Sequence, residues 1–219
     1  MQTYEAIRAR EDIKTYITLA DRSLKALGYT EHSFAHVTHT AETVKYILTT
    51  QGHSSREVEL GMIAAYLHDI GNLINRVDHS QSGAMMAFSL LREMQLPPEE
   101  IATVVTAIGN HDEGSGVPVN PIAAALILAD KSDVRRSRVR NQEFAQFDIH
   151  DRVNYSVKKS WLSIDEEQGQ IRLTLEVDTQ FSSVTDFFEI FLTRMRLCRR
   201  AAETLGLEFK LIINGQMML

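Results

Sequence analysis

The stretch Tyr66-Leu67-His68-Asp69-Ile70-Gly71 follows an apolar run, residues 62–65, and places an imidazole directly beside a carboxylate. Burying either group without a partner is costly, so an adjacent histidine and aspartate at the end of a buried helix need a binding partner. A metal ion is a partner that both side chains can coordinate. The stretch therefore predicts a helical fold built around a metal site, to which other parts of the chain contribute ligands.

The composition is that of an ordinary globular protein of 219 residues, 44% hydrophobic and 24% charged. A formal net charge of −6 does not indicate a nucleic-acid partner. The single Cys198 excludes an internal disulfide and fits a reducing compartment. The first residues lack the apolar segment of a signal peptide, and no apolar stretch approaches the roughly 18 to 20 residues that span a bilayer. We expect a cytoplasmic protein without a membrane partner.

Helical patterns fill the first two thirds of the chain. Apolar residues spaced by three and four predict one amphipathic helix from Tyr4 to Leu27, ended by Gly28. Ser54-Ser55-Arg56-Glu57 has the pattern of a capping box, which opens the helix that ends at the His-Asp pair. Pro97-Pro98 and Asn120-Pro121 mark the starts of two further helices. The fold class expected here is mainly α.

The pattern changes near residue 140. The elements predicted beyond it are two strands, a helix and a third strand, at residues 157–164, 171–177, 184–205 and 207–213. We expect a helical metal-binding domain over residues 1–145 and a small C-terminal α/β (ββαβ) element over residues 146–219. This element would pack on the same core or form the interface of a homodimer.

Candidate metal ligands stand at or near the ends of the predicted helices. Asp130 closes an entirely apolar run, residues 122–129. Three histidines compete for one position early in the chain, and His36 is favoured because its helix face becomes apolar one turn later, with His39 and His32 as alternatives. The full set is His36, His68, Asp69, His79, His111 and Asp130.

This constellation resembles the HD superfamily of metal-dependent phosphohydrolases, over roughly residues 30–133. The resemblance implies an HD-domain helical bundle in which one metal is held by His36, His68, Asp69 and Asp130. His79 and His111 would complete a dinuclear site, with Asp69 as the bridging and catalytic carboxylate.

The resemblance also implies a reaction. A phosphate ester of a small molecule, with nucleotides among the candidates, would be hydrolysed by attack of a metal-activated water. Imidazole and carboxylate ligands suit a divalent transition metal (Fe, Mn, Co, Ni or Zn, with Mg also allowed), and one or two ions per chain are expected. Two such ions lower the pKa of a shared water and clamp a phosphoryl oxygen.

Some positions depart from patterns common in the superfamily. Asn72 stands where many members have lysine, and Asn110 precedes His111 where cyclic-dinucleotide phosphodiesterases carry a second histidine. Their Gly-Tyr-Pro signature is also missing, so cyclic dinucleotides are not favoured. Lys131, which follows Asp130 and opens a basic run, and Asn72 are the candidates for substrate contact.

Two other functions share these residues. Some proteins of the superfamily hold a mixed-valent di-iron centre and cleave C–C or C–P bonds with O₂. Others could use the site as a non-catalytic sensor or interaction module. The sequence alone leaves both open, because only the ligands are shared within a superfamily while the pocket walls vary.

Overall fold

The structure is a computed structural model that describes residues 2–140 and 149–219. Its N-terminal part is helical, and the elements are α1 (Tyr4–Ala9), α2 (Glu11–Ala26), α3 (Phe34–Thr50), α4 (Ser55–Leu67), the 3-10 helix η1 (Ile70–Leu73), α5 (His79–Glu93), α6 (Pro98–Gly109), α7 (Pro121–Ser132) and the 3-10 helix η2 (Arg136–Arg138). The expected boundary between residues 145 and 146 lies outside the described residues.

The C-terminal part contains a four-stranded sheet and two helices. Its elements are α8 (Ile149–Ser156), β1 (Val157–Asp165), β2 (Gln170–Val177), α9 (Val184–Thr204), β3 (Glu208–Ile213) and β4 (Gln216–Met217). The strand order is β1-β2-β3-β4. Strands β1 and β2 form an antiparallel hairpin, whereas β3 pairs parallel to β2, with Leu173 opposite Leu211. Helix α9 makes the crossover that a parallel pair requires.

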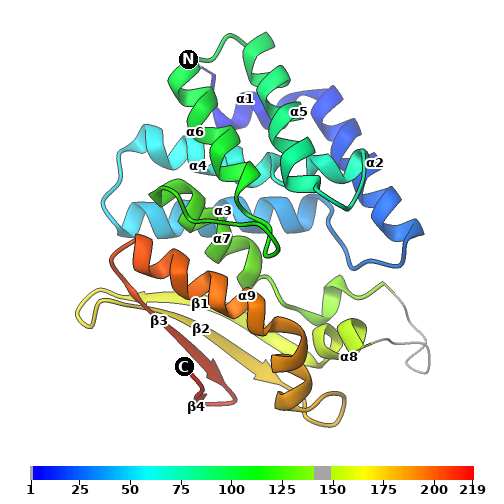
Figure 1. The fold of residues 1–219 in the computed structure, drawn as a ribbon, viewed down its shortest axis with the longest axis vertical. Helices are drawn as coiled ribbons and strands as arrows, with labels where there is room; N and C mark the ends of the chain where they lie inside the picture. Colours follow the sequence, from blue (N-terminus) through cyan, green and yellow to red (C-terminus); the bar gives the residue numbers. More distant parts are fainter. Residues whose placement is uncertain (1, 141–148) are drawn as a thin grey trace.

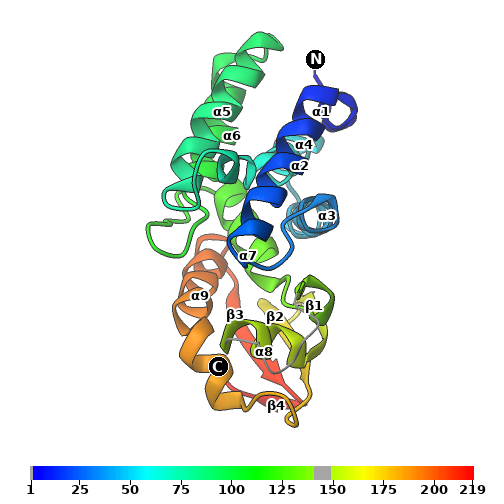
Figure 2. The same ribbon diagram turned by 90° about the vertical axis from the view of Figure 1, so that its right-hand side faces the viewer.

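Helix α9 joins the two parts. Figure 1 shows the helices α1 to α7 above the sheet, with α9 lying across the sheet face, and Figure 2 shows α9 alongside one face of the sheet, below the helical part. Helices α7 and α9 are in contact, and the buried side chains of both parts belong to one hydrophobic core. The run of residues 122–129 in α7 is completely or almost completely buried, because neighbouring elements cover it on every side.

The mainly helical class with a small C-terminal α/β element is confirmed. The predicted single helix from Tyr4 to Leu27 is wrong at Arg10, which has an extended backbone (φ −71°, ψ 123°) and separates α1 from α2. Periodicity misses this break because Ile7 and Ile13 are buried on both sides of it. Helix α8 and the two-residue strand β4 were not predicted.

Close packing fixes where the central helices lie. The capping box at Ser54 and Glu57 forms as predicted and begins α4. Within α4, a Cβ on Gly61 would lie only 2.7 Å from Leu48 Cδ1 and 2.8 Å from Val44 Cγ1 of α3. Glycine thus allows α3 and α4 to approach closely, which brings the start of α3 towards the end of α4. In the two described segments, no helix is long and apolar enough to cross a membrane.

Candidate metal centre

The six candidate ligands lie within or shortly after five helices, near one end of each, and come together there. His36 lies in the first turn of α3, His79 begins α5, and Asp130 lies near the end of α7. His68 and Asp69 directly follow α4, and His111 follows α6. All six are 9% exposed or less, although four of them are histidines and two are carboxylates. Burying six polar side chains together is costly unless they share a binding partner.

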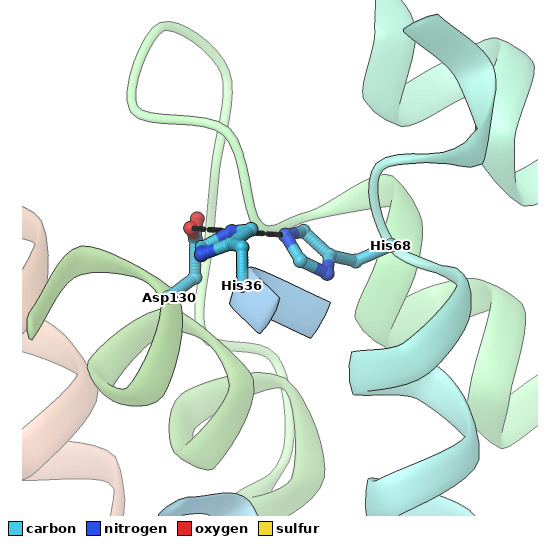
Figure 3. Close-up of side chains that lie close together, drawn as sticks. All are labelled: His36, His68 and Asp130. Carbon is cyan, nitrogen blue, oxygen red and sulfur yellow. Dashed lines mark hydrogen bonds and ion pairs between the residues drawn. The ribbon is translucent and has the colours of Figure 1, made fainter. Parts of the chain in front are cut away.

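Four ligand atoms form a first cluster, namely His36 Nε2, His68 Nε2, Asp69 Oδ2 and Asp130 Oδ1. His36 Nε2 lies 3.3 Å from His68 Nε2, 3.3 Å from Asp130 Oδ1 and 3.5 Å from Asp69 Oδ2. His68 Nε2 lies 3.3 Å from Asp69 Oδ2 and 3.7 Å from Asp130 Oδ1. Figure 3 shows His36 between Asp130 and His68, with the three side chains pointing towards one another.

A second cluster uses the other oxygen of the same aspartate. His79 Nε2 lies 3.1 Å from His111 Nε2 and 3.5 Å from Asp69 Oδ1, which is also 4.0 Å from His111 Nε2. Asp69 therefore presents Oδ2 to the first cluster and Oδ1 to the second. This is the arrangement of a carboxylate that bridges two ions.

Each histidine is oriented by a hydrogen bond from its Nδ1 atom. His36 Nδ1 donates to Asp133 Oδ2 at 2.8 Å, and His68 Nδ1 donates to the carbonyl oxygen of Ala65 at 2.7 Å. The Nδ1 atoms of His79 and His111 likewise donate to backbone carbonyls, of Arg76 and Ile108, at 3.1 and 2.6 Å. With Nδ1 engaged, the Nε2 atom of each ring faces its cluster, as in many metal sites, and His79 Nε2 also meets Arg76 Nη1 at 3.3 Å.

The clusters perturb the pKa values of their own members. Burial lowers the pKa of His68, but the carboxylates of Asp69 and Asp130 outweigh it and raise that pKa to about 10. Burial also lowers the pKa of His79, and burial together with the nearby His68 holds the pKa of His111 well below its usual value. The two carboxylates thus favour positive charge at the first cluster.

The ligand geometry fits a divalent ion. Ligand atoms about 2.0 to 2.2 Å from a tetrahedral ion lie roughly 3.3 to 3.6 Å apart, close to the 3.3 to 3.7 Å that separate His36 Nε2 and His68 Nε2 from each other and from the two carboxylate oxygens. Asp69 Oδ2 is buried and has no hydrogen-bond partner among the described residues. In the second cluster the Nε2 lone pairs of two neutral rings face each other across 3.1 Å, which a cation between them would resolve.

Comparison with known proteins matches residues 32–136 to the HD domain. The chain is an HD-domain protein. It is also similar to the uncharacterized protein MJ1020 of Methanocaldococcus jannaschii, at 21% identity over 211 residues, which cover 85% of this chain and 79% of that protein. A solved structure of a predicted HD superfamily hydrolase from an uncultured Thermotogales bacterium is 23% identical, with a TM-score of 0.46, and covers 62% of this chain and 75% of that one.

The remaining sequence candidates lie in different places. His39 is largely exposed on α3 and outside the clusters, whereas His32 lines the cavity beside them and contacts the ring of His36 at 5.5 Å between centroids. Asn72 is buried behind Asp69, and its Nδ2 donates to Asp69 Oδ1 at 3.0 Å, so its amide positions this carboxylate. Asn72 is not among the residues that line the cavity.

Lys131 does line the cavity, but its charge is already paired. Its Nζ lies 2.7 Å from Asp130 Oδ2 and 2.5 Å from Glu113 Oε2. These two carboxylates outweigh burial and raise the pKa of Lys131 above its usual value. Glu113 also binds Arg194 of α9, with 3.1 Å between Oε1 and Nη2. Lys131 therefore links the candidate ligand Asp130 to the C-terminal element.

Three residues near the HD-domain ligands were missed by sequence reasoning. Asp133 holds His36, Glu113 joins Lys131 to α9, and Arg76 approaches His79 Nε2 at 3.3 Å. Asp133 follows Asp130 by three residues, and this spacing could have identified it from the sequence. Arg76 and Glu113 lie in loops, where no periodicity marks a side chain as inward.

A cavity of about 430 Å³ opens onto the two clusters. Asp69, His79, His111 and Asp130 form part of its wall, whereas His36 and His68 lie behind them. Its charged lining balances, with four acidic residues and four basic ones: Asp69, Glu113, Asp130 and Asp151 against Arg76, Lys131, Arg138 and Arg194. Each divalent ion bound by the clusters would therefore give the cavity a net positive charge.

Proposed function

We propose that this HD-domain protein is a metal-dependent hydrolase, and that its substrate is a phosphate ester of a small molecule, with nucleotides as the first class to test. The observation that carries the proposal is Asp69, whose two oxygens face two separate clusters of imidazole Nε2 atoms. When bound there, divalent ions would lower the pKa of water towards neutrality and polarise a phosphoryl oxygen.

The protein's own residues supply orientation and charge. Asn72 fixes the bridging carboxylate, and Asp133 fixes the ring of His36. The cavity size falls within the range of roughly 300 to 1,000 Å³ typical of small-molecule sites. Once ions are bound, its positive charge favours an anionic ligand such as a phosphate ester. Cys198, the single cysteine, is buried with a pKa raised to about 12, which disfavours it as a nucleophile.

The test is phosphate release by the purified protein loaded with Mn²⁺, Co²⁺ or Fe²⁺. The panel should contain nucleoside monophosphates, cyclic nucleotides and simple aryl phosphates. We expect turnover of at least one class and its loss in Asp69→Asn. Asp78→Asn is a matched control, because Asp78 is exposed, next to His79, and has a left-handed backbone (φ 56°) that asparagine tolerates.

A metal-loaded protein that releases no phosphate from any member of the panel would contradict the proposal. Oxygen uptake by the iron-loaded protein in the absence of phosphate release would instead support a di-iron oxygenase. Two irons per chain by elemental analysis would be required for that outcome.

A further inference from the structure

Arg76 lies in the loop between η1 and α5, at the edge of the second cluster. Its Nη1 lies 3.3 Å from Asn72 Oδ1 and 3.3 Å from His79 Nε2. The guanidinium also stacks over the ring of Tyr29, 5.6 Å from its centroid. Tyr29 and Arg76 both line the cavity. The arginine is thus held in place at the cavity wall by Asn72, by the candidate ligand His79 and by the ring of Tyr29.

The charge of Arg76 is not paired as the other cationic charges of the cavity are. Lys131 and Arg194 share Glu113, and Arg138 Nη1 lies 3.8 Å from Asp133 Oδ2. In the described segments, Arg76 has no carboxylate oxygen within the 4.0 Å of an ion pair and makes only neutral contacts. A partly buried guanidinium without an anion is costly, and such a cation is characteristic of sites where the ligand itself supplies the negative charge.

We propose that Arg76 binds the phosphoryl group of the substrate. The inference rests on the proposed function and gives it a residue for recognition. A planar guanidinium can donate two parallel N–H bonds to two phosphoryl oxygens, which a lysine ammonium cannot do. Its place beside His79 puts this donor next to the second cluster, while Tyr29 supports its face and Asn72 holds one edge. Lys131, with two carboxylates around its ammonium, is left to stabilise Asp130 and Glu113.

Binding of inorganic phosphate to the Mn²⁺-loaded protein, measured by calorimetry, tests the assignment without relying on turnover. Arg76→Gln should weaken phosphate binding about tenfold to a hundredfold, since a charge-assisted pair of hydrogen bonds is lost. Arg76→Lys should weaken it less, because charge is kept while the fork is lost. Arg92→Gln on the exposed side of α5 is the matched control and should leave binding unchanged.

Two further readouts separate recognition from positioning. Metals per chain should be the same in the wild type, Arg76→Gln and Arg76→Lys, and for any substrate found, KM should rise more than kcat falls. Loss of metal in Arg76→Gln and Arg76→Lys alike would overturn the proposal, because Arg76 would then act by orienting His79. Unchanged phosphate binding in both variants, or a metal-loaded wild type that binds no phosphate, would also overturn it.

The outcomes distinguish this inference from the proposed function. A wild type that binds phosphate through Arg76 but hydrolyses nothing on the panel contradicts the hydrolase and keeps the assignment. A wild type that hydrolyses a phosphate ester while Arg76→Gln binds phosphate normally contradicts only the assignment.

Discussion

Asp133 is the residue on which the orientation of His36 depends. It is 2% exposed and accepts hydrogen bonds from His36 Nδ1 at 2.8 Å and from Arg135 Nε at 2.7 Å. Burial alone would raise the pKa of this carboxyl, but the contacts with His36 and Arg135 help to hold it well below its usual value. A carboxylate in this position makes the imidazole a better ligand and fixes which nitrogen faces the ion.

Asp133→Asn should therefore weaken metal binding about tenfold to a hundredfold, the usual effect of losing a carboxylate behind a ligating histidine. The neutral amide can still accept from Nδ1 but no longer raises the basicity of the ring. Titration of the metal-free protein with Co²⁺, followed by its absorption, measures the change. Asp78→Asn should bind as the wild type does, and an Asp133→Asn affinity equal to that of the wild type would remove this role.

The sequence could predict the candidate ligands, because they are polar residues in or after apolar segments. It could not predict the residues that orient those ligands. His68, Asp69 and Asp130 are conspicuous because they interrupt or end apolar runs. Asp133 and Arg76 are polar residues in polar surroundings along the chain, and only the fold brings Asp133 to His36 across 97 positions. Asn72 stood in the right motif, but its contact with Asp69 shows that it faces the carboxylate rather than the cavity.

At the scale of elements, η1 and α5 pack closely because Gly71 in η1 has no side chain. A Cβ on Gly71 would lie 2.0 Å from the carbonyl oxygen of His79 and 2.4 Å from the backbone nitrogen of Gly83. Because these are backbone atoms, they can move only if α5 moves as a whole. The glycine therefore lets the start of α5, with His79, lie against the turn that follows Asp69.

Gly71→Ala should cost about 3 kcal/mol of folding free energy or more, since overpacking against backbone has no side chain to relax. It should also lower metal occupancy, because His79 moves with α5. Urea unfolding and elemental analysis measure the two effects. Gly109→Ala is the control, because its Cβ would meet Ala84 at an ordinary 3.7 Å. Equal stability of the two variants would contradict the close approach.

Arg56 of α4 contacts the start of α6 and the segment before α1. Its guanidinium binds both oxygens of Glu100 at the start of α6, Nη1 donates to Glu59 Oε2 at 2.6 Å, and Nη1 also donates to the carbonyl oxygen of Gln2 before α1. The hydrogen bonds from Arg56 hold the pKa of Glu100 below its ordinary value of 4.5. A lowered pKa in the folded state means that the pair stabilises the protein when Glu100 is charged.

The contribution of this pair should be present above about pH 4.5 and disappear as the pH falls through the lowered pKa. Glu100→Gln should cost about 1 kcal/mol at pH 7, a size typical of a bidentate, partly exposed ion pair, and the difference from the wild type should shrink below pH 4.5. Thermal unfolding across pH measures it. Glu99→Gln, an exposed neighbour, should show no such dependence, and a Glu100→Gln cost that is constant down to pH 3 would count against the pair.

Long helices and strands were predicted more accurately than short ones, because their hydrophobic pattern extends over more residues. The strands β1 to β3 and helix α9 were predicted to within two residues, because alternation and helical periodicity extend over whole segments there. Strand β4 has two residues and α8 has eight, too short for periodicity to show. The parallel pairing of β2 with β3 depends on the crossover through α9, a long-range contact that no local pattern records.

At the scale of the whole molecule, the candidate ligands lie at the ends of α3, α4, α5, α6 and α7, so a bound ion would hold these ends together. Binding an ion to the folded state alone stabilises it by about 2.7 kcal/mol when the ion is at a hundred times its Kd. For a chain of this size, that corresponds to a rise in Tm of roughly 5 to 10 °C. We expect this rise with Mn²⁺ or Co²⁺ and its reversal by a chelator. Ca²⁺ should have little effect, because imidazole ligands do not suit it.

The same experiment shows how far the stabilisation reaches. Trp161, the single tryptophan, lies in β1, and Asp130, Lys131, Glu113 and Arg194 form a chain of ion pairs from the metal ligands to α9 on the sheet. Since both parts share one core, tryptophan fluorescence and helical circular dichroism should lose their signals at the same temperature, and metal should raise both midpoints equally. Asp69→Asn should abolish the shift in both signals, whereas Asp78→Asn should keep it. If metal raised the helical midpoint and left the tryptophan midpoint unchanged, the C-terminal element would be a separate folding unit, and the ion-pair chain would not couple it to the metal centre.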